Sequence, residues 1–217
     1  MKYSEQIKKI ARSYFNELDK SDFSHGFTHV QRVLTFCFVI SKKEGGDLEI
    51  LEAAALLHDI SRSREDNGEV EDHAKEGALL AEQILKEVGF PQEKIQNVLH
   101  CIAVHRSKKE DISRSLEAKI LQDADRLDAL GAIDIARVIG SSFQSKQFNR
   151  PIYVDEPYND ENDDNKSAIH YLIHKTVQPK RKPESFNTET GRKIAEERFK
   201  FSLDFIDRFI KEWHGEL

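Results

Sequence analysis

Apolar residues recur at the helical period along almost the whole chain, and this pattern constrains the fold most. Examples are the stripes Ile7, Ile10, Ala11, Tyr14 and Ile95, Val98, Ile102. Residues three or four positions apart share one face of an α-helix, whereas no stretch shows the strict alternation typical of a half-buried β-strand. With 5 Pro and 10 Gly among 217 residues, helix breakers are few. The sequence therefore predicts an all-α protein.

Cap and turn residues divide the pattern into successive helices. Gly45 and Gly46 end one helix, Asp47 is a suitable N-cap for the next, and Gly89 stops a later one. The segment SRSREDNGEVED, residues 61–72, is expected to be a charged loop. The expected helices span about residues 3–18, 27–44, 48–58, 73–88, 91–105, 115–139, 167–177 and 188–213.

The composition of the chain changes after Gly140. Residues 141–165 are polar and rich in Asp, Asn and Pro, which predicts a long surface loop or lid. We expect a helical core over residues 1–140. Residues 141–217 are expected to supply the loop or lid and C-terminal helices that pack on the core as a single compact unit.

Charge and cysteine content argue against several classes of protein. A net charge of -6 gives no broad basic surface for a stable nucleic-acid partner. Cys37 and Cys101 fall within helical patterns, which is typical of reduced buried thiols. The absence of a signal-peptide pattern and of an apolar run of about 18 residues predicts a cytoplasmic protein without a membrane partner. The oligomeric state is left open.

Histidines with metal-binding chemistry lie on the apolar stripes. His29 and His58 fall on two stripes, His105 ends a third, and Asp59 follows His58 directly. Each histidine alone is compatible with a core residue bonded to a carbonyl, because a buried imidazole needs a partner. Together with Asp59 and an aspartate of DADRLD, they favour a mixed nitrogen and oxygen site for a divalent metal.

Helical phase does not decide which downstream aspartate joins this group. Asp128 lies nearest the apolar face centred on Ala124, and Asp123 and Asp125 lie on its flanks. All three aspartates remain candidates on this criterion.

The order His29, then His58–Asp59, then an aspartate resembles the metal ligands of the HD superfamily of metal-dependent phosphohydrolases. The resemblance extends to SHGFTHVQRV, LEAAALLHDI, EAKILQDADRLDALGAIDIARV and FNTETGRKIAEERFKFSLDFI, and it points to an uncharacterised bacterial branch. It implies an HD-domain helical bundle with a C-terminal helical extension. Because the family ligand in A-D-R precedes the basic residue, it also implies the metal ligands His29, His58, Asp59 and Asp125.

The resemblance implies roles for four further residues. Arg126 is similar to the basic residue that contacts substrate phosphate in related enzymes, the alternative being a solvated helix face. Asp123 becomes a candidate acceptor that orients a metal ligand. His73 and His105 could hold a second metal bridged by Asp59 or contact substrate phosphate, and we favour phosphate because one metal needs only four ligands.

The function implied is a metal-dependent phosphohydrolase acting on a nucleotide or another small phosphorylated metabolite. One divalent ion (Mn, Fe, Ni, Co, Zn or Mg) would activate water for attack on phosphorus, with two ions as the alternative. A di-iron oxygenase, which needs both His73 and His105 as ligands, and a non-catalytic nucleotide-binding sensor are the rival functions. The intact set of four ligands argues against the sensor.

His170 and His174 have the i,i+4 spacing of a zinc-binding pair. Tyr171 occupies the position where a zinc protease carries Glu. Both histidines are therefore expected to be surface or lid residues.

Overall fold

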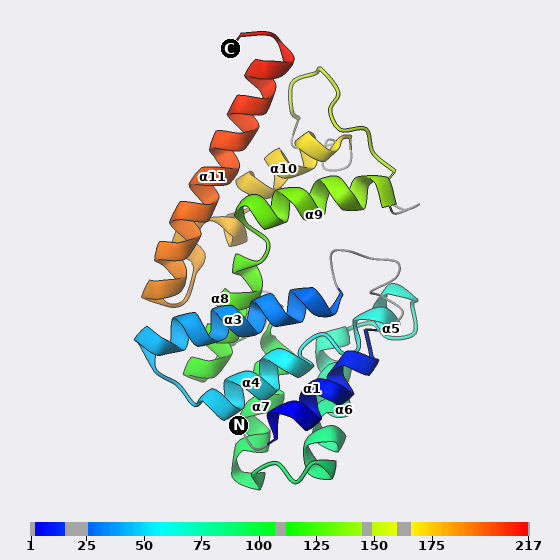
Figure 1. Ribbon diagram of the computed structural model, residues 1–217, viewed down its shortest axis with the longest axis vertical. Helices are drawn as coiled ribbons and strands as arrows, with labels where there is room; N and C mark the ends of the chain where they lie inside the picture. The colour runs from blue at the N-terminus through cyan, green and yellow to red at the C-terminus, as the bar shows by residue number, and fades with distance from the viewer. Residues whose placement is uncertain (1–2, 16–25, 107–111, 145–148, 160–165, 217) are drawn as a thin grey trace. The chain divides into compact units, whose positions relative to one another are not determined.

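The computed structural model describes residues 3–15, 26–106, 112–144, 149–159 and 166–216, and these residues contain helices, turns and loops without a strand. This confirms the predicted all-α class. The helices, labelled as in Figure 1, are α1 (Ser4–Ser13), α3 (Phe27–Glu44), α4 (Leu48–Leu57), α5 (Arg62–Asp66), α6 (His73–Glu87), α7 (Gln92–Val104), α8 (Leu116–Leu127), α9 (Gly131–Gln144), α10 (Ala168–Val177) and α11 (Glu189–Trp213), with 3-10 turns η1 (Pro179–Arg181) and η2 (Pro183–Ser185).

The described residues up to Asp125 form one compact unit, and those from Arg126 onward form a second. The boundary falls inside α8 and therefore precedes residue 140, after which the composition of the sequence changes. The expected domain boundary at that residue, and the expectation of a single compact unit, stay predictions.

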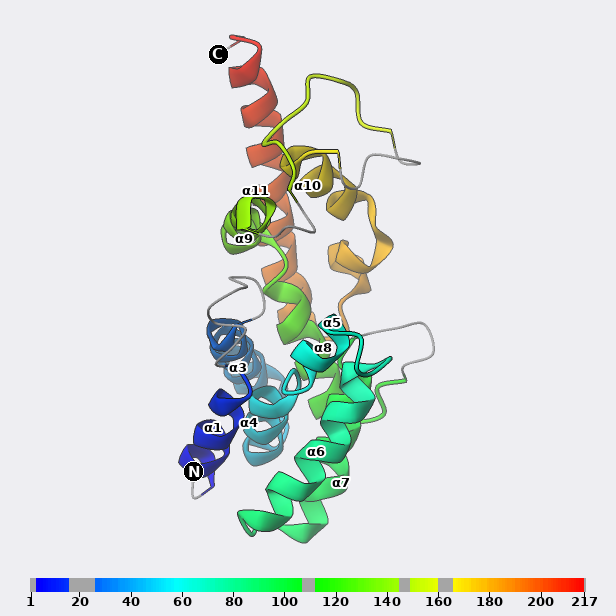
Figure 2. The same cartoon turned by 90° about the vertical axis from the view of Figure 1, so that its right-hand side faces the viewer.

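Helix α4 is the central element of the first unit. It packs against α3, α7 and α1, and α6 lies beside α7 in both views (Figures 1 and 2). All residues of α4 from Ile50 to Leu57 are buried. The Asp47 carboxylate caps the helix by accepting from the backbone N–H groups of Glu49 at 2.9 Å and Ile50 at 3.3 Å. Because the N-terminus of α4 is capped and its residues are buried, the C-terminal end of the helix and His58, which follows it, lie in the interior.

Part of the expected charged loop after α4 is the short helix α5. Arg62 and Asp66 are one helical turn apart, and the Arg62 Nε donates to Asp66 Oδ1 at 3.0 Å. This local ion pair favours a helical turn in a segment without apolar periodicity. The loop prediction was therefore wrong for Arg62–Asp66.

The expected continuous helix over residues 115–139 is divided into α8 and α9. Gly131 begins α9 with φ +77°, a conformation that favours glycine, and its N–H donates to the Ser202 hydroxyl at 3.0 Å. Asp128, in the break, accepts from Arg137 at 2.7 Å. The periodicity continues through the break, so it does not reveal the turn.

The predicted polar loop begins later than expected, because α9 continues to Gln144. The Ser142 hydroxyl donates to the carbonyl of Val138 at 2.8 Å, which keeps this polar residue compatible with the helix. Residues 149–159 are non-helical, and Pro151 accepts from the N–H of Ala168 at 2.9 Å. The parts of the predicted lid at residues 145–148 and 160–165 lie outside the described residues.

The second unit is built on α9, α10 and α11, which pack against one another (Figure 1). Its core contains Ile135, Val138, Ala168, Ile169, Leu172 and Ile206. Thr188 caps α11 by accepting from the N–H of Gly191 at 3.0 Å, as expected from the predicted start of this helix. The segment QPKRKPES after α10 contains η1 and η2.

Cys37 and Cys101 are buried and form no disulfide, as predicted. In the part of the chain that the structure describes, no helix combines the length and apolar character needed to cross a membrane.

Candidate functional site

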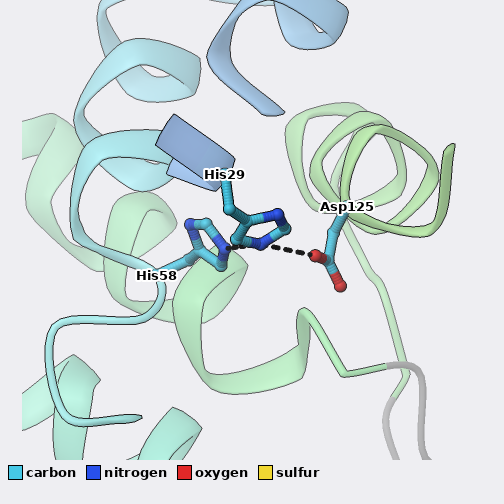
Figure 3. Close-up of side chains that lie close together, drawn as sticks. All are labelled: His29, His58 and Asp125. Carbon is cyan, nitrogen blue, oxygen red and sulfur yellow. Dashed lines mark hydrogen bonds and ion pairs between the residues drawn. The ribbon is translucent and has the colours of Figure 1, made fainter. Parts of the chain in front are cut away.

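Three residues from different helices of the first unit point toward one another (Figure 3). His29 lies in the first turn of α3, His58 follows the last residue of α4, and Asp125 lies on α8. The Nε2 atom of His29 is 3.4 Å from His58 Nε2 and 3.3 Å from Asp125 Oδ1. Asp59 Oδ2 lies 3.7 Å and 3.6 Å from the same two nitrogens. The four residues expected to bind metal are therefore close together.

The other carboxylate oxygen of Asp59 faces a second pair of histidines. His73 Nε2 lies 3.1 Å and His105 Nε2 lies 3.3 Å from Asp59 Oδ1, and the two nitrogens are 3.4 Å apart. His73 is the first residue of α6, and His105 follows the last residue of α7. Asp59 therefore stands between the two histidine pairs, with one oxygen toward each.

The outer ring nitrogens orient the histidines for this arrangement. His58 Nδ1 donates to the carbonyl of Ala55 at 2.8 Å, and His105 Nδ1 donates to the carbonyl of Ile102 at 2.7 Å. A neutral imidazole that donates from Nδ1 carries its lone pair on Nε2, the atom that faces the cluster. Carbonyl partners at Nδ1 are also typical of histidines that bind metal. A buried histidine that is held by a backbone carbonyl at Nδ1 can therefore also bind a metal through Nε2.

Burial and charge set the protonation of the cluster. Burial, together with His105 and His29, lowers the pKa of His58 to about 4, so its ring is neutral at pH 7. Burial opposes ionisation of Asp59, but His58, His105 and His73 hold its pKa well below the usual value. The pKa of Asp125 is lowered in the same way, chiefly by its hydrogen bond with His29 and by the charge of that residue.

The donor set fits a divalent cation. Two ionised carboxylates and the neutral ring of His58 bring two negative charges and a lone pair to one place, beside the ring nitrogens of the other histidines. Within the described residues, two groups have ligand atoms close enough to hold an ion: His29, His58, Asp125 and His58, Asp59, His105. Nitrogen and oxygen donors suit first-row divalent metals better than soft-ligand metals.

Glu65 is a residue next to the cluster that the sequence analysis missed, and Arg62, whose place shortly after His58–Asp59 suggests the rim of the pocket, is a second residue near Asp59. The Glu65 carboxylate accepts from His73 Nδ1, and it also accepts from Arg106 Nη1 at 2.7 Å. The charge of Asp59, against the effect of burial, raises the pKa of Arg62. Both residues belong to α5, which the sequence predicted to be loop. The only available signal was their position a few residues after His58–Asp59.

The other predicted site residues are held by neighbours of their own. Arg126 Nε donates to the carbonyl of Lys180 at 3.1 Å, and its guanidinium lies 4.1 Å from the centre of the Phe186 ring, both within the second unit. Asp123 is fully buried, and Asp128 is paired with Arg137. The phosphate-contact role of Arg126 and the orienting role of Asp123 stay predictions, as do the other site roles.

The expectation that His170 is a surface residue was wrong. His170 is fully buried, with Nδ1 2.7 Å from the Ser167 hydroxyl and Nε2 3.1 Å from the carbonyl of Glu156. His174 Nδ1 lies 2.9 Å from the Tyr158 hydroxyl. These polar partners satisfy both rings inside the second unit.

Comparison with known families matches residues 26–130 to the HD domain, a range that contains all six histidine and aspartate residues of the cluster. A predicted HD superfamily hydrolase from an uncultured Thermotogales bacterium is 34% identical, with a TM-score of 0.69 over 97% of this chain and 93% of that chain. An HD-superfamily hydrolase from Bacillus thuringiensis is 31% identical, with a TM-score of 0.71 over 99% of both chains.

The uncharacterised protein YpgQ of Bacillus subtilis is similar over its whole length. Its sequence is 32% identical over 219 residues, which cover 99% of this chain and 96% of YpgQ. A crystal structure of YpgQ in complex with ADP superposes with a TM-score of 0.70 and 29% identity, over 97% of this chain and 95% of that chain.

Proposed function

The chain belongs to the HD superfamily, and we propose that it is a metal-dependent phosphohydrolase acting on a nucleotide or another small phosphorylated metabolite. The observation that carries this proposal is the convergence of His29, His58, Asp59 and Asp125 in one buried cluster. The names of the similar hydrolases support hydrolysis, and the complex of YpgQ with ADP supports a nucleotide substrate.

We propose that one divalent ion binds between the Nε2 atoms of His29 and His58 and the carboxylates of Asp59 and Asp125. Such an ion lowers the pKa of a water molecule and polarises a phosphoryl oxygen. The chain's contribution is to keep both carboxylates ionised and the His58 ring neutral. Asp59 is 5% exposed, whereas the Asp125 side chain is 27% exposed, so substrate reaches the cluster from the side of Asp125.

His73 and His105 are proposed to contact the phosphoryl group. Their Nε2 atoms lie on the Oδ1 side of Asp59, next to the proposed ion. Although burial opposes it, Asp59 raises the pKa of His105, and a protonated Nε2 can donate to phosphoryl oxygens and offset the charge that develops there. Glu65 positions the His73 ring through Nδ1, and Arg106 in turn holds Glu65. Arg62 adds a positive charge near Asp59, and Arg126 keeps its proposed role as a phosphate contact.

Hydrolysis of a metabolite panel tests the proposed function. The full-length protein is freed of metal with a chelator, and Mn, Mg, Ni, Co or Fe is then added with each phosphorylated compound. We expect release of phosphate or pyrophosphate from nucleotides with at least one of these metals and none in chelator. Binding of metal and nucleotide without turnover would instead identify a nucleotide sensor.

The same samples separate hydrolysis from oxygen chemistry. The second group, His58, Asp59 and His105, offers a place for a further ion, which an HD-type di-iron oxygenase would need. Two irons per chain with oxygen uptake would replace the proposed function. We expect neither, and we expect the protein to act in the cytoplasm without a membrane or a stable nucleic-acid partner.

A further inference from the structure

Two cations lie against the ring of Tyr171 in the second unit. The guanidinium of Arg150 lies 4.4 Å and the ammonium of Lys175 lies 5.8 Å from the centre of this ring. Arg150 is 6% and Lys175 is 8% exposed, so both charges lie in the interior. Burial of a charge is costly unless opposite charge or hydrogen-bonding groups compensate it.

Carboxylates balance part of this positive charge. Lys175 donates to Asp134, which is itself buried, and Arg137 donates to Asp128 at 2.7 Å. Two cations thus have carboxylate partners that come from α9 or from the turn before it. These pairs account for Lys175 and Arg137 but leave the positive charge of Arg181 uncompensated.

The Arg181 side chain has no hydrogen bond or ion pair with another side chain among the described residues. The residue ends the 3-10 turn η1, which packs against α10, and its Nε is buried with no hydrogen bond in the described part of the chain. Burial and the positive charges of Arg181 and Arg137 together lower the pKa of Lys175 to about 8. A buried donor of this kind is normally satisfied by water or by a ligand.

We propose that Arg150 and Lys175, which lie against the Tyr171 ring, and Arg181 on the neighbouring turn η1 form a binding site for a phosphate-bearing anion. A guanidinium presents several N–H donors in a plane that matches phosphate oxygens, and a lysine ammonium adds a compact positive charge. The anion would complete the hydrogen bonding of Arg181 Nε and relieve the repulsion between Arg181 and Lys175. This site does not depend on the hydrolase activity proposed above.

Binding of inorganic pyrophosphate to the full-length protein tests the site. Calorimetric titration is performed in chelator, which removes any binding through metal. Arg181→Gln is the informative variant, because Arg181 is half-buried, has no side-chain partner to lose, and so can be replaced without breaking an ion pair. Lys182→Gln is the matched control, since it removes one exposed positive charge at the next position.

We expect saturable binding to the parent chain and a loss of about 10- to 100-fold in affinity for Arg181→Gln, the range typical of a charge-assisted hydrogen bond. Lys182→Gln should change the affinity less than about twofold, as for a solvent-screened charge. No saturable binding, or equal losses in both variants, would overturn the site. Because no metal or turnover is involved, this result is independent of the phosphatase panel.

Kinetics with the metal-loaded protein test whether the anion regulates turnover. Added pyrophosphate should change the rate of the parent chain at saturating substrate and leave the rate of Arg181→Gln unaltered. The same response in both proteins, or none in the parent chain, would contradict a functional anion site.

Discussion

Asp59 has a different position in the cluster from the other acidic residues, because its two oxygens face two different histidine pairs. Oδ2 lies within 3.7 Å of His29 and His58, and Oδ1 lies within 3.3 Å of His73 and His105. A carboxylate in this position links the proposed metal ligands to the proposed phosphate contacts. Loss of its charge would therefore affect metal binding and the orientation of His73 and His105 together.

Asp125 should matter more for metal binding than the aspartates beside it. Asp125 Oδ1 lies 3.3 Å from His29 Nε2, whereas Asp128 is paired with Arg137 in the second unit. We expect Asp125→Asn to lower the metal content, measured by mass spectrometry of the purified chain, more than Asp123→Asn or Asp128→Asn does. If Asp128→Asn loses its metal while Asp125→Asn keeps it, Asp128 and not Asp125 is the metal ligand.

His73 and His105 are tested by measuring bound metal and turnover in the same samples. If both residues contact phosphate, His73→Ala and His105→Ala should each still bind about one metal ion per chain. Their turnover should fall by about 10²–10³, as for loss of an oxyanion donor. A fall from two ions to one would assign them to a second metal instead. Unchanged metal and unchanged turnover in both variants would leave them as ordinary core residues.

Histidine positions could be predicted from the sequence better than their supporting residues. His29, His58 and His105 lie on apolar stripes, so burial follows from the helical period alone. Glu65 and Arg62 lie in a charged segment without a period, and their contacts depend on how α5 folds back toward α6. The choice of Asp125 needed the resemblance to a family, because Asp128 lies nearest the apolar face, Asp123 and Asp125 lie on its flanks, and helical phase alone does not select the ligand.

At the scale of elements, helix starts were predicted more accurately than breaks within a periodic pattern. Asp47 and Thr188 cap the helices that were expected to follow them, because a side-chain oxygen at this position satisfies exposed N–H groups. The break between α8 and α9 depends on Gly131, Asp128 and Arg137, two of which pair across the turn. Such a contact is tertiary and leaves no periodic signal.

The pair of Lys175 on α10 and Asp134 on α9 should make stability depend on pH. Burial, Arg181 and Arg137 lower the pKa of Lys175 from 10.5 to about 8, although Asp134 opposes the shift. Between these values the unfolded chain binds more protons than the folded chain, so the free energy of unfolding rises as pH rises. The contribution of one group is at most about 1.4 kcal/mol per pH unit.

The fluorescence of Trp213, the single tryptophan, reports unfolding of the second unit, because its ring contacts Tyr153 and Phe209. Urea unfolding in chelator is followed at several pH values between about 8 and 10. The control, Lys175→Met with Asp134→Asn, removes both charges and should lose this part of the pH dependence. The same slope in the control and the parent chain would show that Lys175 is not responsible.

At the scale of the whole molecule, fold class followed from the sequence but the division into units did not. A sustained 3.6-residue period with few breakers is sufficient to predict an all-α chain. The boundary at Asp125–Arg126 lies within one helix, where composition and periodicity do not change. Which helices form a common core depends on packing between residues far apart in sequence, and a single sequence does not contain that information.

We propose that the cluster around Asp59 holds a metal on which phosphohydrolase activity depends. The most direct test compares metal-dependent hydrolysis of a nucleotide by the parent chain and by Asp59→Asn, with circular dichroism to verify that the variant is folded. We expect a divalent ion to restore turnover to the chelated parent chain but not to Asp59→Asn, which should also bind less metal. Equal turnover of the two proteins, or turnover by the parent chain that persists in chelator, would contradict it.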